Sequence, residues 1–113
     1  MIEYDEYDLL ELFDLESKIF WNEDKEAFKY EHSQKNGWRI EFFMSPLSNM
    51  CRIVIWFKEN TDPITNIHCT SIEKVLCRNK ENKLIIVKKD NPKKLIVLFK
   101  PQYVIGFAEI LLT

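Results

Sequence analysis

The side chains in this sequence that most readily do chemistry belong to two histidines and three cysteines: His32, His68, Cys51, Cys69 and Cys77. Adjacent side chains of an extended strand point to opposite faces, so His68 and Cys69 cannot pair as base and nucleophile if they lie in a strand. Their spacings match no zinc-ligand pattern. We therefore interpret the thiols as reduced and structural and expect neither a metal nor a cofactor. A small Cys/His metal protein or enzyme around His68 and Cys69 is kept as an alternative.

The motifs of common cofactor and hydrolase sites are missing from the sequence. Gly37 and Gly106 are its 2 glycines, too few for a glycine-rich phosphate-binding loop. No GxSxG motif occurs. Carboxylates are frequent before residue 32, and at that density each one is more readily a solvated charge than half of an acid–base pair. The sequence thus favours a protein that is not an enzyme.

The first element that positions these residues is a helix. Acidic residues at its start suit the helix dipole, and the segment 3–20 predicts roughly four to five turns. One apolar stripe at helical spacing supports this prediction, formed by Leu9, Leu12, Phe13 and Phe20.

After residue 25 the pattern changes to alternating or continuous apolar segments that are typical of strands. Strands are expected over 27–32, 37–44, 51–58, 83–88, 94–100 and 103–112, whereas 64–77 is compatible with a strand or a helical turn. Short connections predict antiparallel neighbours. We therefore predict one α+β domain over residues 1–113. An N-terminal helix packs on an antiparallel sheet of about six strands, which is compatible with a small barrel or sandwich.

Lysines flank the predicted hairpin between strands 83–88 and 94–100. They are interpreted first as charged strand ends that keep apolar strands soluble. Nucleic-acid binding requires a basic stripe with aromatic stacking positions, and no such aromatic motif accompanies these bases. A nucleic-acid-binding accessory protein is therefore only an alternative, and its residues would be Arg78, Lys80, Lys83, Lys88, Lys89, Lys93 and Lys94.

Charge is distributed unevenly along the chain. Residues 1–31 contain eleven acidic residues against three lysines, a net charge of −8, whereas residues 32–113 contain thirteen bases against seven acids, a net charge of +6. The acidic segment either docks on the basic remainder or faces a basic partner. For the second case, the predicted partner-binding residues are Asp5, Glu6, Asp8 and Glu11.

A second candidate surface is aromatic. Alternation places Arg39 and Phe43 on one face of the strand 37–44, and it places Arg52 and Trp56 on one face of the strand 51–58. If these strands pair, they present a surface of residue types that are enriched at protein interfaces. The competing expectation, favoured because the helix must bury its stripe somewhere, is that the helix covers this face and Trp56 is core.

These observations together predict a non-enzymatic cytoplasmic inhibitor that binds another protein. Examples are a bacterial toxin-immunity protein or a phage-encoded inhibitor of a nuclease. The predicted partner is a basic protein such as a nuclease toxin, whose substrate groove an acidic helix can occupy by imitating phosphate charge. No apolar run approaches the ~20 residues that span a bilayer, and the start of the chain does not resemble a secretory signal. No membrane partner is therefore expected.

Overall fold

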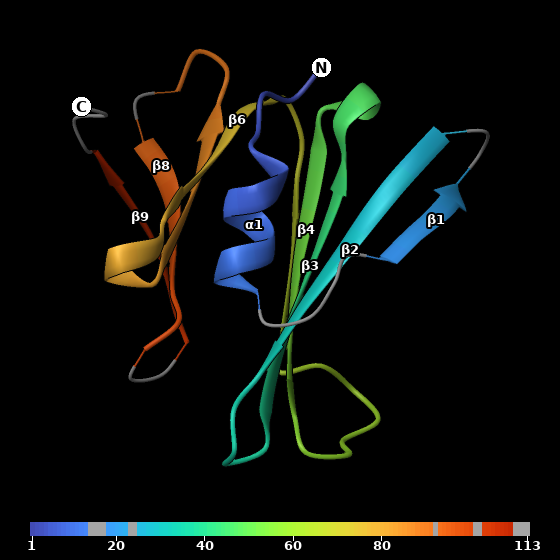
Figure 1. The fold of residues 1–113 in the computed structure, drawn as a ribbon, viewed down its shortest axis with the longest axis vertical. Coiled ribbons are helices and arrows are strands. Elements are labelled where there is room, and N and C mark those ends of the chain that lie inside the picture. The colour runs from blue at the N-terminus through green and yellow to red at the C-terminus, as the bar shows by residue number, and fades with distance from the viewer. Residues whose placement is uncertain (14–17, 23–24, 92, 101–102, 110–113) are drawn as a thin grey trace.

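The computed structural model describes residues 1–13, 18–22, 25–91, 93–100 and 103–109. Its helix and strands are, in chain order, α1 (Glu6–Leu12), β1 (Lys18–Asn22), β2 (Lys25–Ser33), β3 (Trp38–Ser45), β4 (Met50–Phe57), β5 (Thr65–Cys69), β6 (Ile72–Arg78), β7 (Lys83–Lys88), β8 (Lys93–Leu98) and β9 (Val104–Glu109). The 3-10 helices η1 (Pro46–Ser48) and η2 (Asn79–Glu81) lie in the β3–β4 and β6–β7 connections. The predicted α+β class is confirmed (Figure 1).

The strands form two antiparallel sheets. One has the order β1-β2-β3-β4-β5 and the other β6-β7-β8-β9, so within each sheet consecutive strands of the chain pair with one another. Antiparallel pairing was predicted correctly, but the described residues hold nine strands in two sheets and not about six in one. The ambiguous segment 64–77 accounts for much of this difference, because it forms both β5 and β6. Ser71 stands between them with a φ of 56°, and the chain passes there from one sheet to the other.

The helix is shorter than predicted. It ends at Leu12, and Phe13 has extended backbone angles of φ −96° and ψ 124°. Leu9, Leu12 and Phe13 are all buried, so the apolar stripe is confirmed up to that point. Phe20 does not extend it, because Lys18–Asn22 pairs with β2 as strand β1. The aromatic and β-branched residues of that segment suit a strand, and pairing with β2 overrides the helical spacing.

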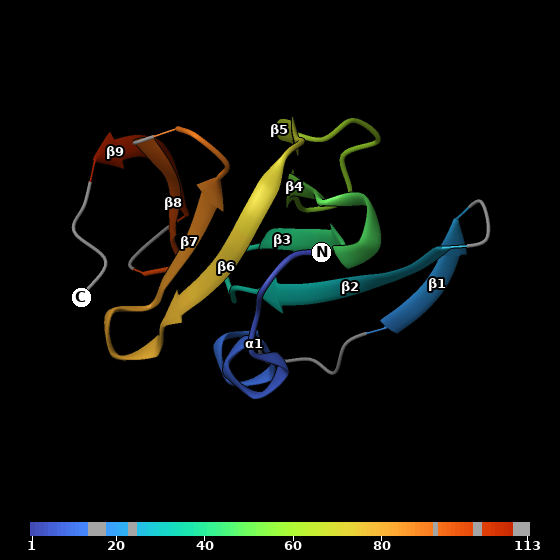
Figure 2. The ribbon, with the colours of Figure 1, turned by 90° about the horizontal axis from the view of Figure 1, so that it is seen from above.

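The core lies between the two sheets and α1. Figure 2 shows α1 beside β2 and β6, where the two sheets spread apart. The N-terminal segment runs along β6 as well, since Glu3 N–H donates to the Glu73 carbonyl and Val75 N–H donates to the Glu3 carbonyl, at 3.0 and 2.9 Å. Side chains from the helix and both sheets form one buried cluster, which includes Leu9, Phe13, Tyr30, Phe42, Ile53, Val75, Leu84, Ile86, Val97 and Phe99.

Hydrogen bonds between buried His32 of β2 and Tyr103, which precedes β9, link the two sheets. The Tyr103 hydroxyl donates to the His32 carbonyl at 2.9 Å and lies 2.7 Å from His32 Nδ1. Because the hydroxyl proton is used on the carbonyl, Nδ1 must be the donor in the second bond. His32 therefore has a structural partner, and it is separated from the cysteines. Among the described residues, no helix is long and apolar enough to cross a membrane.

Candidate functional site

The strand register assembles the aromatic surface that the sequence predicted. Arg39 is directly opposite Trp56, and Phe43 is directly opposite Arg52, on the paired strands β3 and β4. Their neighbours Ile40, Phe42 and Ile53 point into the core, so alternation turns these four side chains away from it. We call this side of the β1–β5 sheet the outer face. It comprises Lys29, Glu31, Arg39, Glu41, Phe43, Arg52, Val54, Trp56, Asn66 and His68.

The expectation that α1 covers the outer face is wrong. Phe13, at the end of α1, stacks on Phe42 with ring centroids 5.9 Å apart, so the helix packs on the inner face of this sheet. That face is the more apolar of the two, since Ile40, Phe42 and Met44 all lie on it. Trp56 is consequently half-buried on the outer face and is not part of the core cluster.

Cations lie over the two half-buried aromatic rings of the outer face, Phe43 and Trp56. The guanidinium carbon of Arg39 lies 5.5 Å from the centroid of the Trp56 ring. Lys29 Nζ and the Arg52 guanidinium carbon each lie 5.8 Å from the centroid of the Phe43 ring. These distances are within the range of cation–π attraction. The stacks hold long basic side chains in place, which lowers the entropy lost when a partner binds them.

A buried carboxylate anchors the middle of the outer face. Glu41 is 7 % exposed. It accepts a hydrogen bond from Trp56 Nε1 and pairs with Lys29 Nζ at 2.7 Å. Lys29 also pairs with Glu31 at 2.7 Å. Burial acts to lower the pKa of Lys29, but its bonds to Glu31 and Glu41 outweigh that effect and leave the pKa above its usual value. Lys29 is thus neutralised locally, whereas Arg39 and Arg52 form no ion pair with a described carboxylate.

A cavity of about 490 Å³ opens at one end of the outer face. Phe43 and Arg52 line it, together with Asn66 and His68 from β5. Arg52 Nε donates to Asn66 Oδ1 at 3.0 Å, which fixes the guanidinium at the cavity wall. None of the described residues that line the cavity is acidic. The cavity therefore has an aromatic wall and a positive charge, a combination suited to an anionic group carried next to an apolar one.

The acidic residues predicted for partner binding lie on α1 and at its N-cap. Glu6, Asp8 and Glu11 are exposed, and none of their carboxylates forms an ion pair with a described base. Asp5 is exposed too, but its carboxylate accepts a hydrogen bond from the Asp8 N–H at 3.1 Å and caps the helix. The negative charge of this described segment thus faces solvent. We call these exposed side chains, with Tyr7, the α1 surface.

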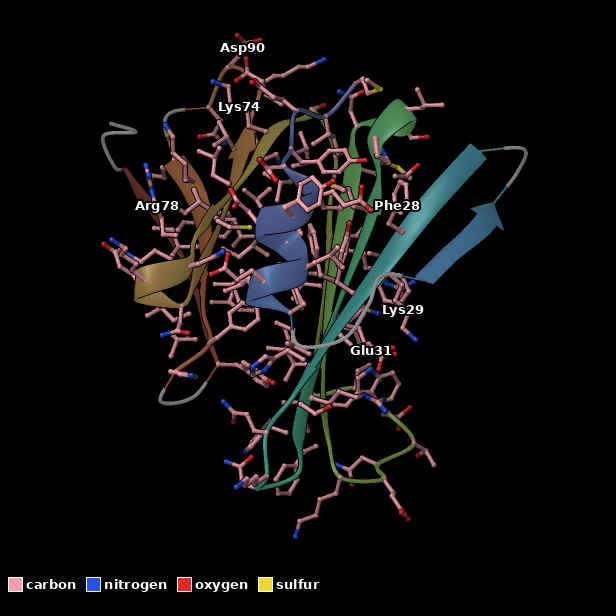
Figure 3. All side chains as sticks on the ribbon, in the orientation of Figure 1. Phe28, Lys29, Glu31, Lys74, Arg78 and Asp90 are labelled. Atoms are coloured by element: carbon pink, nitrogen blue, oxygen red, sulfur yellow. The ribbon has the colours of Figure 1, made fainter. Side chains whose placement is uncertain are left out.

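The α1 surface and the outer face lie on opposite sides of the β1–β5 sheet. α1 packs against the inner face through Phe13, whereas the outer-face side chains project the other way. Figure 3 shows Lys29 and Glu31 on one side of α1, and Lys74 and Arg78 of β6 on the other. The eight residues predicted for partner binding are therefore brought together as two groups of four, and not as one surface.

The cysteines and histidines do not converge. His68 is exposed on the outer face, whereas Cys69 is buried in the core, as the alternation of a strand predicts. Cys51 and Cys69 are paired in register on β4 and β5. Among the described residues, no group of three or more His, Cys, Asp or Glu side chains is placed to hold a metal ion. That no metal or cofactor binds remains a prediction.

The thiols are expected to be unreactive in the folded protein. Burial, the largest cause, raises the pKa of Cys51 and Cys69, and burial with the nearby Asp8 and Asp5 carboxylates raises the pKa of Cys77 to about 12. Because the thiolate is the nucleophile, a thiol reagent at pH 8 should label the native protein slowly and label all three cysteines in denaturant. Rapid labelling of any cysteine in the native state would contradict the structural interpretation.

The lysine-rich alternative is not assembled into one stripe. Arg78 pairs in register with Lys83 at one end of β7, and η2 places Lys80 at this same end. Lys88 ends that strand at its opposite end, and Lys89 follows it in the turn before β8. Lys83 also pairs with Glu81 at 3.0 Å. The hairpin is confirmed, and the seven bases are divided between its two ends.

Sequence reasoning did not place four of the outer-face residues on this surface: Lys29, Glu31, Asn66 and His68. Alternation alone would have placed Asn66 and His68 on one face of a strand. Their position beside Arg52 depends on the pairing of β5 with β4, which no local pattern specifies.

Comparison with known proteins gives one informative likeness. No protein-family model matches the sequence, and no curated protein matches it. A chain of a solved structure described as a contact-dependent growth inhibition toxin–immunity protein complex from Klebsiella pneumoniae 342 has a similar fold, with a TM-score of 0.75 and 18 % sequence identity. The match covers 96 % of this chain and 97 % of that chain. The two chains therefore share a fold over nearly their whole lengths.

Proposed function

We propose that this chain is a non-enzymatic inhibitor of the immunity-protein type, which binds a toxin and blocks it. The observation that carries this proposal is the likeness in fold, over 96 % of this chain, to a chain of a toxin–immunity protein complex. Two features favour the binding member of such a pair over the catalytic member. His68 and Cys69 face opposite sides of β5, and burial keeps the thiols protonated.

The proposed partner is a basic toxin, and a nuclease is the class that fits best. A nuclease needs a positive groove for the phosphates of its substrate, and exposed carboxylates can fill such a groove in place of phosphate. Glu6, Asp8 and Glu11 provide three such carboxylates on one short helix, without ion pairs to described bases. We propose that they make the first contact with the toxin, and that the inhibitor acts in the cytoplasm.

The test is protection of growing cells. We expect a toxin gene immediately upstream of the gene for this chain. Cells that produce this toxin alone should stop growing, and cells that also produce this chain should grow normally, because a tight inhibitor at equal or higher concentration leaves little free toxin. An unrelated protein made at the same level is the control. Continued growth arrest in cells that contain the folded chain would contradict the proposed function.

A further inference from the structure

The outer-face cavity lies in a cross-strand row of side chains in which Arg52 and His68 form no ion pair with a described carboxylate. Lys29, Phe43, Arg52 and His68 are directly opposite one another across β2, β3, β4 and β5. Lys29 forms ion pairs with Glu31 and Glu41, and among the described residues that line the cavity the basic ones are Arg52 and His68. Their nearest neighbours in the row are an aromatic ring and each other. An acidic group from outside would therefore meet hydrogen-bond donors here without displacing an ion pair between described residues.

Arg52 is prepared to bind such a group. Its Nε donates to Asn66 Oδ1, and its guanidinium carbon lies 5.8 Å from the centroid of the Phe43 ring, so both contacts restrain the orientation of the fork before anything binds. Its two terminal nitrogens form no hydrogen bond with any described residue, and the side chain is exposed. A guanidinium fork presented in this way favours a carboxylate, which it can bind through two parallel hydrogen bonds.

The chain itself presents a matching group on the far side of the molecule. Tyr7 is 83 % exposed on α1, the most exposed of the large apolar side chains described. Glu11 lies one helical turn further on, so its carboxylate and the Tyr7 ring share one face of the helix. Asp8 follows Tyr7 directly. The α1 surface thus offers an aromatic ring beside carboxylates, and the cavity offers an aromatic wall beside Arg52.

We propose that the outer-face cavity binds the α1 surface of a second copy of this chain. Tyr7 of one copy packs against Phe43 of the next, and Glu11 pairs with Arg52 and His68. A molecule cannot fill its own cavity, because α1 packs on the opposite side of the sheet.

This contact joins two different surfaces, so it is head-to-tail. Each added copy leaves one cavity and one helix open, and association proceeds to short chains of copies and not to a closed pair. A contact made by so few side chains predicts weak, concentration-dependent association. If the proposed function holds, a toxin and a second copy compete for α1. The self-association itself does not depend on that function and is measured without a toxin.

Two complementary variants test the contact. The helix variant Tyr7→Ala/Glu11→Gln keeps the cavity and loses the group that fills it. The cavity variant Arg52→Gln/His68→Gln keeps α1 and loses the groups that bind it. All four side chains are exposed, so both variants should fold, and circular dichroism verifies this. Each substitution pair should weaken association about tenfold or more, the usual effect of removing a Tyr or Arg hot spot.

Sedimentation velocity over a concentration series gives the result. The unmodified chain should sediment faster as its concentration rises and less so at high salt, whereas each variant alone should remain monomeric. An equimolar mixture of the two variants should form a 1:1 dimer that grows no further, because the intact helix of one fits the intact cavity of the other.

An unmodified chain that stays monomeric, as it would if the cavity bound another protein, overturns the proposal. A mixture that does not associate also overturns it. Because no toxin is present in this experiment, its result is independent of the proposed function.

Discussion

Replacing Phe13 with alanine should lower the free energy of unfolding by about 3–5 kcal/mol, the usual cost of removing a buried aromatic ring. Phe13 is fully buried at the end of α1. Its ring centroid lies 5.6 Å from that of Tyr30, 5.9 Å from that of Phe42 and 5.1 Å from that of Phe99. One side chain thereby joins the helix to the β1–β5 sheet and to the end of β8. The loss is a large fraction of the ~5–15 kcal/mol that stabilises an ordinary domain.

Urea unfolding followed by tryptophan fluorescence measures this effect. Tyr7→Ala is the matched control, because it removes an aromatic ring of similar size from an exposed position of the same helix. We expect the control to change the free energy of unfolding by less than ~0.5 kcal/mol. A Phe13→Ala protein that is as stable as the control would show that α1 does not anchor the core.

The burial of Phe13 was predictable from the sequence, but its extended backbone conformation was not. Helical spacing with Leu9 and Leu12 identifies the apolar stripe, because the period reports which side chains share a face. The same spacing carries the prediction on to Phe20, where the chain in fact forms β1. A helix of this length depends on tertiary contacts, and local spacing contains no information about the strand with which the next segment pairs.

The division of the strands into two sheets could not be predicted for a similar reason. Turns between strands usually contain glycine, proline or asparagine. Between β5 and β6 the turn is made by Thr70 and Ser71, and Ser71 takes a positive φ that its residue type does not suggest. Its carbonyl accepts a hydrogen bond from the Lys89 N–H at 2.9 Å, a contact that exists only once β7 has folded beside it.

The grouping of residues on the outer face was predicted correctly, but the contacts among their side chains were not. Alternation correctly grouped Arg39 with Phe43 and Arg52 with Trp56, because a strand has a fixed period of two. The side on which α1 packs was also readable, since the inner face of β3 is apolar throughout while its outer face carries Arg39 and Glu41. The hydrogen bond from Trp56 to Glu41 depends on the β3–β4 register and was not predictable from either strand alone.

Neutralising α1 should slow association with a basic toxin by about 10- to 100-fold at low salt, because charge steering raises association rates by this order. The variant is Glu6→Gln/Asp8→Asn/Glu11→Gln. Asp5 is left unchanged, because its carboxylate caps the helix and its loss would affect folding. The difference should shrink as salt rises, since exposed charges are screened beyond ~8 Å at physiological ionic strength.

A matched variant removes three exposed carboxylates elsewhere: Glu59→Gln/Asp62→Asn/Asp90→Asn. It has the same net charge as the α1 variant, but its changes lie in the β4–β5 and β7–β8 connections. It therefore separates the position of the charge from the total charge. We expect its association rate to fall by less than about threefold, because steering depends on charges near the contact.

The most direct measurement is the association rate constant of the purified chain with its toxin, determined by stopped flow for the unmodified chain and both variants over a salt series. The predicted result is fast association of the unmodified chain, slow association of the α1 variant at low salt, and convergence of the two at high salt. Equal association rates for all three proteins at every salt concentration would contradict the claim that the carboxylates of α1 make the first contact with the toxin.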